Sequence, residues 1–297
     1  MWLPPIPEPA RNPALRRPGH MDVLLPRRAY AASALNWRET LLNPVSMTLL
    51  FAGLTASLIG AAWAQDAASA QPSVFSVLLK WTPLLGEGFA YNVLISLLSM
   101  LIGTVLGVML GILQVSPLMP VRKFAWLVTQ FFRNSPWLVL LFYSILLIPF
   151  QVTAFGITVP FPGWLKAVIG LSLPVMAYMS EYVRGAILSV PTGQWESAES
   201  LGFTRGQTMR MVILPQTVKR ILPNWMNLYA VLTMATPLVS IIGVDDIMGY
   251  TRSALSAEGR PDILIPMYLY VLSWFFAYCY PISLVTSWLE RRYSVKL

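Results

Sequence analysis

The side chains that could act on another molecule are few in this sequence and lie within long apolar runs. Glu181 and Arg184 stand three residues apart, so on a helix they are neighbours and can form an ion pair. They lie about two turns before Pro191, which favours a structural or gating pair over direct contact with a solute. Arg133 comes before Pro136, where a helix is expected to break, and could anchor that bend or bind a solute carboxylate.

A second polar group accompanies another proline. Thr236 and Ser240 stand four residues apart beside Pro237, so on a helix they share a face and could line a polar path. Asp245 and Asp246 follow, and a solvated loop is the expected place for both carboxylates. Side chains of these kinds can bind and guide a polar solute.

Residue types exclude most catalytic and metal chemistry. The single cysteine, Cys279, lies in an apolar run and the single histidine, His20, lies in a polar tail, so we expect neither a His/Cys metal site nor an internal disulfide. The sequence has no G-x-S-x-G elbow and no G-x-x-x-x-G-K-[ST] loop for ATP. We therefore expect a protein that is not an enzyme, with no cofactor and no metal on this chain.

The segment 194–216, QWESAESLGFTRGQTMRMVILPQ, is unusually polar for its surroundings. Gly202 suits the left-handed position that ends a helix, and Thr204 with Gln207 forms a capping box for a second helix that runs to Pro215. Apolar residues recur every third position in the first helix and predict a short apolar stripe: Trp195, Ala198 and Leu201. Such an element can fill a groove on another protein, with Glu196 as a charge partner, or can touch only its own chain.

The elements that would position these groups are membrane helices. The chain has 297 residues, of which 56% are hydrophobic and 11% charged, with a mean hydropathy of +0.61. Soluble domains carry about 25% charged residues. Apolar runs long enough to span a bilayer follow a basic, proline-rich tail over 1–44, and no alternating barrel pattern is present, so we expect an all-α polytopic membrane protein. The runs are 45–64, 90–113, 124–150, 164–190, 225–244 and 264–289.

Prolines and glycines inside the runs carry further information. Prolines break or kink membrane helices where protein or a water-filled cavity satisfies the freed carbonyls, which mildly favours a transport path over a passive anchor. They are Pro136, Pro174, Pro237 and Pro281. Gly103, Gly107 and Gly111 recur every four residues and predict a face on which another helix packs closely.

Lysine and arginine positions predict the topology. With 191–224 placed inside, fifteen basic residues fall on inside segments and three on outside segments. Basic residues mark the cytoplasmic side, so the tail, 191–224 and the C-terminal 293–297 are expected in the cytoplasm, and 65–87 is a periplasmic connection. This bias explains the net charge of +8 without nucleic acid as a partner.

The run 45–64 has two interpretations. Ala62-Trp63-Ala64 has the small-x-small form of a signal-peptidase site, so the run could be a signal sequence that ends at Ala64. The preceding 44 residues are long for a signal peptide, which favours a retained first transmembrane helix.

The segment 193–216 resembles the signature loop of ABC-importer permeases, written E-A-A, three residues, G, nine or ten residues, I-x-L-P. The matching residues are Glu196, Ala198, Gly202, Ile213, Leu214 and Pro215, with Ser197 in place of the first alanine. The stretches FFRNSPWLVLLFY, YMSEYVRGAILSVPTGQ and LPNWMNLYAVLTMATPLVSIIG are similar to segments of the polar-amino-acid branch of that family. The sequence departs from that branch at Met234, where a lysine is usual, and at Leu140, where a glutamine is usual.

The resemblance implies a five-helix type I importer core over 88–292, preceded by one further helix or a signal sequence. It also implies the partners: a second permease subunit of the same or a homologous kind, membrane lipid, and a periplasmic binding protein that delivers a polar amino acid or related solute. A separate ATPase dimer, which carries ATP and magnesium, would dock on 191–224. The location implied is the bacterial inner membrane. An ion-coupled secondary transporter is the alternative, but it would need inverted repeats and central carboxylates, which we do not find.

Overall fold

The computed structural model describes residues 53, 56–57, 72–154 and 157–293. The chain divides into two units, 1–57 and 58–297, and the description below concerns the second. The expected tail over 1–44 lies outside the described residues, as does almost all of the expected first span at 45–64.

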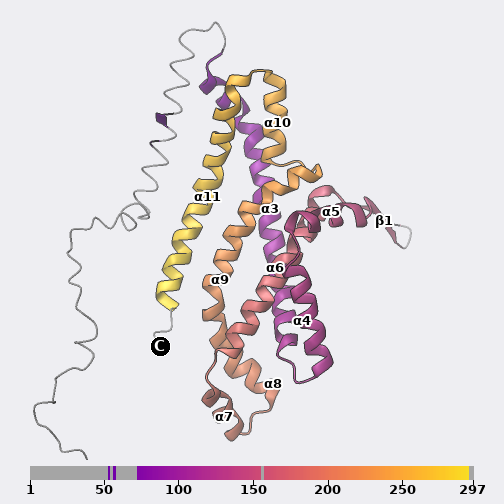
Figure 1. The fold of residues 1–297 in the computed structure, drawn as a ribbon, viewed down its shortest axis with the longest axis vertical. Helices are drawn as coiled ribbons and strands as arrows, with labels where there is room; N and C mark the ends of the chain where they lie inside the picture. The colour runs from indigo at the N-terminus through magenta and orange to yellow at the C-terminus, as the bar shows by residue number, and fades with distance from the viewer. Residues whose placement is uncertain (1–52, 54–55, 58–71, 155–156, 294–297) are drawn as a thin grey trace, which may run out of the picture. The chain divides into compact units, whose positions relative to one another are not determined.

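The second unit is built from helices, with one short hairpin (Figure 1). Its helical elements are α3 (Val74–Gln114), α4 (Met119–Arg133), α5 (Trp137–Leu147), α6 (Gly163–Leu188), α7 (Thr192–Ser200), α8 (Arg205–Gln207), the π-helix η2 (Thr208–Ile213), α9 (Leu214–Ala235), the 3-10 helix η3 (Thr236–Ile242), α10 (Ile247–Glu258), the 3-10 turn η4 (Pro261–Ile263) and α11 (Leu264–Tyr293). Strands β1 (Gln151–Ala154) and β2 (Ile157–Pro160) pair antiparallel, with Gln151 opposite Pro160. The all-α expectation is confirmed except for this hairpin, which the sequence did not indicate.

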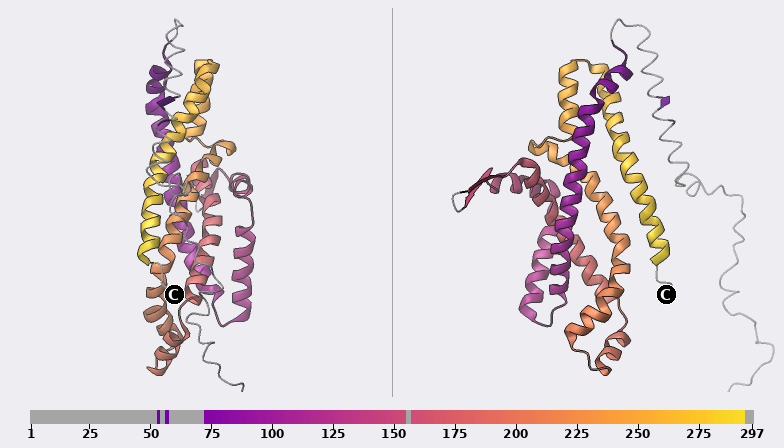
Figure 2. Two further views of the ribbon diagram at one scale, coloured as in Figure 1. Left: turned by 60° about the vertical axis from the view of Figure 1, so that its left-hand side comes forward. Right: turned by 180° about the vertical axis from the view of Figure 1, so that it is seen from behind.

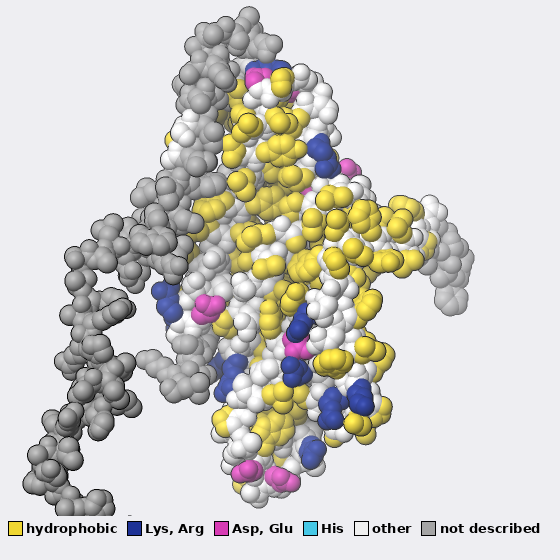
Figure 3. Space-filling model, in the orientation of Figure 1, with side chains coloured by type: hydrophobic (Ala, Val, Ile, Leu, Met, Phe, Trp, Pro, Cys, Tyr) yellow, Lys and Arg dark blue, Asp and Glu magenta, His cyan; other side chains and the backbone are white. Residues whose placement is uncertain are grey.

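Four helical stretches of the described chain are long and apolar enough to cross a bilayer, and α5 is a shorter apolar helix. The stretches are Val74–Gln114, Gly163–Leu188, Arg205–Ile242 and Pro261–Arg292. In the second unit α7 and α8 lie near one end and α10 lies near the other (Figures 1 and 2). Figure 3 shows apolar side chains over the middle of one face, whereas most charged side chains there lie toward the end that carries α7 and α8.

The segment 65–87 was expected to be a connection, but α3 begins within it at Val74, capped by Ser73. At 1.5 Å per residue its 41 residues span about 60 Å, roughly twice the hydrocarbon thickness of a bilayer. The first part of α3 was not predicted as part of an apolar run because Lys80 and Glu87 lower its average hydropathy. The buried residues there still follow helical spacing and pack with α10 and α11: Val74, Val77 and Leu85.

The run at 124–150 was expected to be one span and is two helices. Helix α4 ends at Arg133 and α5 begins after Pro136, whose extended backbone starts the new helix. The proline cannot donate to the previous turn, which explains the break. The position of the break matches the expectation from Ser135-Pro136.

Helix α3 packs against α6 through the three glycines. A Cβ on Gly107 would lie 2.6 Å from the Cβ of Met179 and 2.7 Å from the carbonyl oxygen of Met176. Gly103 and Gly111 meet Val175 and Val183 in the same way. The predicted close packing face is therefore confirmed, and α6 is the helix that occupies it.

The second helix of the polar segment was expected to end at Pro215 and does not. Helix α8 continues through the π-helix η2 into α9, so Arg205–Ile242 is one helical stretch. Pro215 sits in the first turn of α9, directly after η2, so its missing N–H falls where the π-helix changes to an α-helix. The wide turn of η2 immediately before it accommodates the ring that would clash in a regular helix interior.

Candidate functional site

The polar segment forms the two-helix element that its sequence predicts. Helix α7 ends at Ser200. Gly202 follows with a left-handed φ of 79°, and Phe203 N donates to Ala198 O at 3.1 Å. Thr204 and Gln207 then cap α8 reciprocally: Thr204 N donates to Gln207 Oε1 at 2.9 Å and Gln207 N donates to Thr204 Oγ1 at 3.4 Å. Both signals were local, which is why the sequence located them correctly.

One side of α7 is packed and the other is free. Ala198 is 3% exposed, whereas Leu201 is 76% exposed and Glu196 is exposed. The predicted apolar stripe therefore does not lie wholly against its own chain. An exposed leucine and an exposed carboxylate on one short helical element can each be contacted by another protein.

Side chains tie α7 to the membrane helices. Gln216 of α9 donates to Gln194 of α7 at 3.2 Å. Arg220 of α9 donates to the carbonyl oxygen of Ser189, at the end of α6, at 2.6 Å. Ile213, from the matching residues of the signature loop, is fully buried in a cluster with α6. Leu214 is half-buried and Pro215 is exposed. A displacement of α7 would therefore displace α9 through Gln216, and α9 would in turn displace the end of α6 through Arg220.

Glu181 accepts hydrogen bonds from Arg184 at 2.8 and 3.2 Å, which confirms the predicted pair. The same carboxylate oxygen, Oε2, lies 3.9 Å from Nη1 of Arg133. Arg133 and Arg184 are 38% and 37% exposed, and Glu181 is 13% exposed. The sequence did not indicate that the three residues meet, since Arg133 comes from a different helix. The other oxygen of Glu181, Oε1, is buried without a hydrogen-bond partner in the described structure.

Thr236 and Ser240 were expected to share a helix face, but they do not. They lie in η3, a 3-10 helix with three residues per turn, so residues four apart point in different directions. Both side chains are buried, at 0% and 6% exposure. Thr236 Oγ1 donates to the carbonyl oxygen of Thr233 and accepts from Asn92 Nδ2 at 3.1 Å. Within this chain Thr236 therefore stabilises the point where α9 continues into η3, and it does not line an open path.

The expectation of a solvated pair at Asp245 and Asp246 is half wrong. Asp245 is exposed, but Asp246 is fully buried and caps α10 by accepting from Gly249 N at 2.8 Å. Burial raises the pKa of Asp246, although hydrogen bonds from Gly249 and Asn92 and the charge of Arg252 oppose that rise. Asn92, which binds Asp246, is the functional candidate that sequence reasoning missed. A lone asparagine inside an apolar run is the signal that could have found it.

No group of three or more histidine, cysteine or acidic side chains that could hold a metal ion occurs among the described residues.

Residues 103–295, well over half of the chain, match a protein family described as "binding-protein-dependent transport system inner membrane component". The chain belongs to this family. Its relatives include the probable amino-acid ABC transporter permease YckA of Bacillus subtilis, 34% identical over 71% of this chain and 90% of YckA. The L-cystine transport system permease TcyB of the same organism is 34% identical over 71% of this chain and 86% of TcyB.

A solved structure supports the fold of this binding-protein-dependent permease. The crystal structure of an amino acid ABC transporter with histidines has 28% identity and a TM-score of 0.63, over 75% of this chain and 99% of that one. The expected ABC-importer permease family and the type I importer fold are therefore confirmed. The protein is a membrane subunit of a transport system, and the family assignment does not favour an ion-coupled transporter.

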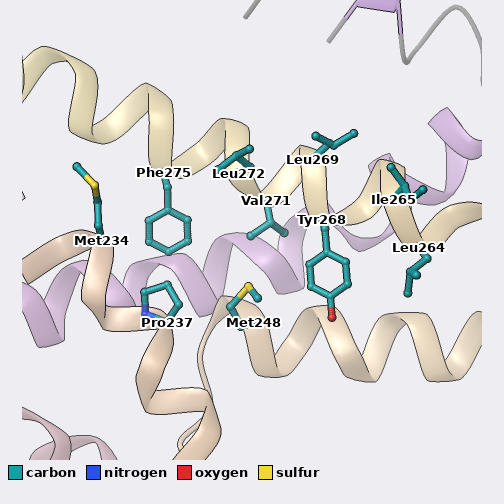
Figure 4. Close-up of a pocket in the computed structure, with 10 residues that line it drawn as sticks. All are labelled: Met234, Pro237, Met248, Leu264, Ile265, Tyr268, Leu269, Val271, Leu272 and Phe275. Atoms are coloured by element: carbon teal, nitrogen blue, oxygen red, sulfur yellow. The ribbon is translucent and has the colours of Figure 1, made fainter. Parts of the chain in front are cut away.

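The permease has an apolar groove of about 650 Å³ between α11 and the segment formed by α9, η3 and α10 (Figure 4). Side chains of α11, among them Val271 and Phe275, face Pro237 and Met248 across it, and Met234 also lines the groove. Met234 is the position where the amino-acid branch usually has lysine. The lining suits hydrocarbon, so this groove is not the polar candidate site.

Proposed function

We propose that this permease forms part of the translocation path of an ATP-driven importer and is coupled to a separate ATPase dimer through residues 191–224. The observation that supports the coupling most strongly is α7, which exposes Glu196 and Leu201 while Gln194 connects it to α9. A partner that moves α7 would move α9 as well. ATP and magnesium would bind to the partner, since this sequence has no phosphate-binding loop.

The proposed solute is a polar amino acid or a related compound. The names of the two relatives, which specify amino acids and cystine, support this class. A periplasmic binding protein would deliver the solute, and a second permease subunit, identical or homologous, would complete the path.

The proposed location is the bacterial inner membrane, with α7, α8 and the C-terminus in the cytoplasm. Basic residues support this orientation, because Arg205, Arg210, Lys219 and Arg220 gather at the α7 end and Arg291 and Arg292 lie near the end of α11. The end that carries α10 would then face the periplasm.

We propose two different roles for the five residues predicted to serve the path. Arg133, Glu181 and Arg184 are partly exposed charges that a solute or a gate can reach. Thr236 and Ser240 are buried, so we propose that they act by holding η3 in place at the periplasmic end of α9.

Reconstitution tests the proposal. The permease is placed in liposomes with the ATPase that co-purifies with it and an amino-acid-binding protein from the same cells, and uptake of a radiolabelled mixture of L-amino acids is measured. We expect uptake that requires ATP and the binding protein and that survives collapse of the proton and sodium gradients. Uptake driven by an ion gradient without ATP would instead support a secondary transporter.

A further inference from the structure

The start of α10 lies directly against the backbone of α3. A Cβ on Gly88 would lie 2.6 Å from Ile247 N and 2.8 Å from the carbonyl carbon of Asp246. Both neighbours are backbone atoms, which cannot turn aside as a flexible side chain can. Glycine at position 88 therefore permits a contact that any larger residue would push apart.

Asn92, one turn further along α3, connects three elements at this contact. Its Nδ2 donates to Asp246 Oδ2 and to Thr236 Oγ1, each at 3.1 Å, and its Oδ1 accepts from Ile247 N at 3.1 Å. Asn92, Thr236 and Asp246 are all fully buried. The donor from Ile247 fixes which end of the amide is oxygen, so the amide must point its nitrogen at Asp246. We call Asn92, Thr236 and Asp246 the clasp.

A second connection holds η3 from the other end. Arg252 of α10 donates to the carbonyl oxygen of Ser240 at 3.0 Å. Helix α10 therefore contacts η3 both through the clasp and through Arg252. Helix α9 runs directly into η3, and Gln216 connects α9 to α7.

We propose that Asn92 and Asp246 are positioning residues for transport: they hold η3 against α3 and α10, so that movement of α9 driven from α7 becomes a change at the opposite end of the permease. This inference rests on the proposed function. The clasp gives η3 a fixed point, without which α9 would move and the periplasmic end would not follow. Loss of the clasp therefore uncouples ATP hydrolysis from import and leaves hydrolysis itself intact.

The clasp can be tested by exchanging the hydrogen-bond donor and acceptor that Asn92 and Asp246 provide. Asp246→Asn turns a second NH2 toward that of Asn92, so two donors meet. Asn92→Asp brings two buried carboxylates together, which is also unfavourable. The double exchange Asn92→Asp with Asp246→Asn restores one donor and one acceptor, and the carboxylate introduced at position 92 can still accept from Ile247 N. Asp245→Asn is the matched control, because Asp245 is exposed and makes no hydrogen bond within the described residues.

The experiment uses the complete importer in liposomes and measures ATP hydrolysed per amino acid imported, with the radiolabelled L-amino acid mixture as probe. We expect each single variant to lower uptake about tenfold at unchanged hydrolysis, and the double exchange to recover to within about threefold of wild type. Thr236→Val, which removes only the hydroxyl, should lie between. Asp245→Asn should match wild type.

Amide hydrogen exchange at Ile247 in the same complexes provides an independent readout. It should be faster in the single variants and slow again in the double exchange. A merely structural role would lower complex yield and hydrolysis together, and normal coupling in Asp246→Asn, or no recovery in the double exchange, would overturn the proposal. If wild type shows no ATP-dependent uptake, the proposed function fails, whereas the exchange data still decide whether the clasp holds η3.

Discussion

Arg133, the last residue of α4, lies 3.9 Å from Glu181, about two turns before the end of α6, measured from Nη1 to Oε2. Arg184 is already bonded to that oxygen at 2.8 Å, so one carboxylate faces two guanidinium groups. The end of α4 is the point where the chain breaks before α5. The Glu181 carboxylate therefore connects the end of α4 to α6. Because two guanidinium groups face one carboxylate, one excess positive charge remains at the site.

That excess charge leads to the first prediction. Arg133→Leu should lower uptake about fivefold with normal complex yield, because Arg133 is partly exposed and its pair with Glu181 is long, so little folding energy is lost. Uptake by reconstituted complex and the yield from affinity purification measure the two effects. Arg122→Leu, on the exposed first turns of the same helix, is the control and should leave uptake unchanged. Equal uptake in the two variants would remove Arg133 from the path.

A second prediction concerns α7. Glu196→Lys should reduce binding-protein-stimulated ATP hydrolysis at least tenfold, because it reverses an exposed charge at the proposed docking surface. Hydrolysis and co-purification of the ATPase are measured together. Glu290→Lys makes the same reversal on exposed α11 and should change neither. A Glu196→Lys complex that hydrolyses ATP and imports normally would show that α7 is not the coupling helix.

Features set by neighbours in the sequence could be predicted from it. The end of α7 before Gly202, the capping box of Thr204 and the pair of Glu181 with Arg184 all depend on contacts within five residues. The glycine face of α3 was also predictable as a face, but its occupant, α6, was not.

Features set by distant partners could not be predicted. The burial of Asp246 depends on Asn92, which is 154 residues away in the sequence. The meeting of Arg133 with Glu181 depends on how α4 packs against α6, and the hydrogen bond from Arg252 to the Ser240 carbonyl oxygen depends on how α10 packs against η3. The sequence near Asp246 provides one donor, the backbone N of Gly249, but the second donor, the side chain of Asn92, comes from α3 and cannot be predicted locally.

The glycine face gives a third prediction. Gly107→Ala should destabilise the permease by about 1–3 kcal/mol, because its Cβ would meet the Met176 carbonyl oxygen at 2.7 Å and the two helices must separate. Thermal unfolding of the purified complex should show a fall of several degrees. Gly185→Ala is the matched control within α6: nothing lies within 4 Å of its added Cβ, so it should be neutral or stabilise by up to ~1 kcal/mol. Equal unfolding temperatures would mean that α3 and α6 do not pack closely.

The last prediction is a pH dependence at the α10 end. Glu258 Oε1 accepts from Lys80 Nζ at 2.6 Å and from Trp81 Nε1 at 2.8 Å, and these hydrogen bonds lower the pKa of Glu258. A lowered pKa means that the stabilisation is present above the ordinary carboxyl range and is lost as pH falls through the pKa of the folded state. Glu258→Gln should therefore unfold at a lower temperature than wild type at about pH 7, and the difference should shrink toward about pH 4. Glu87→Gln, an exposed carboxylate on the same helix as Lys80, should show no such difference. A gap for Glu258→Gln that stays constant with pH would mean that packing, and not charge, holds α10 to α3.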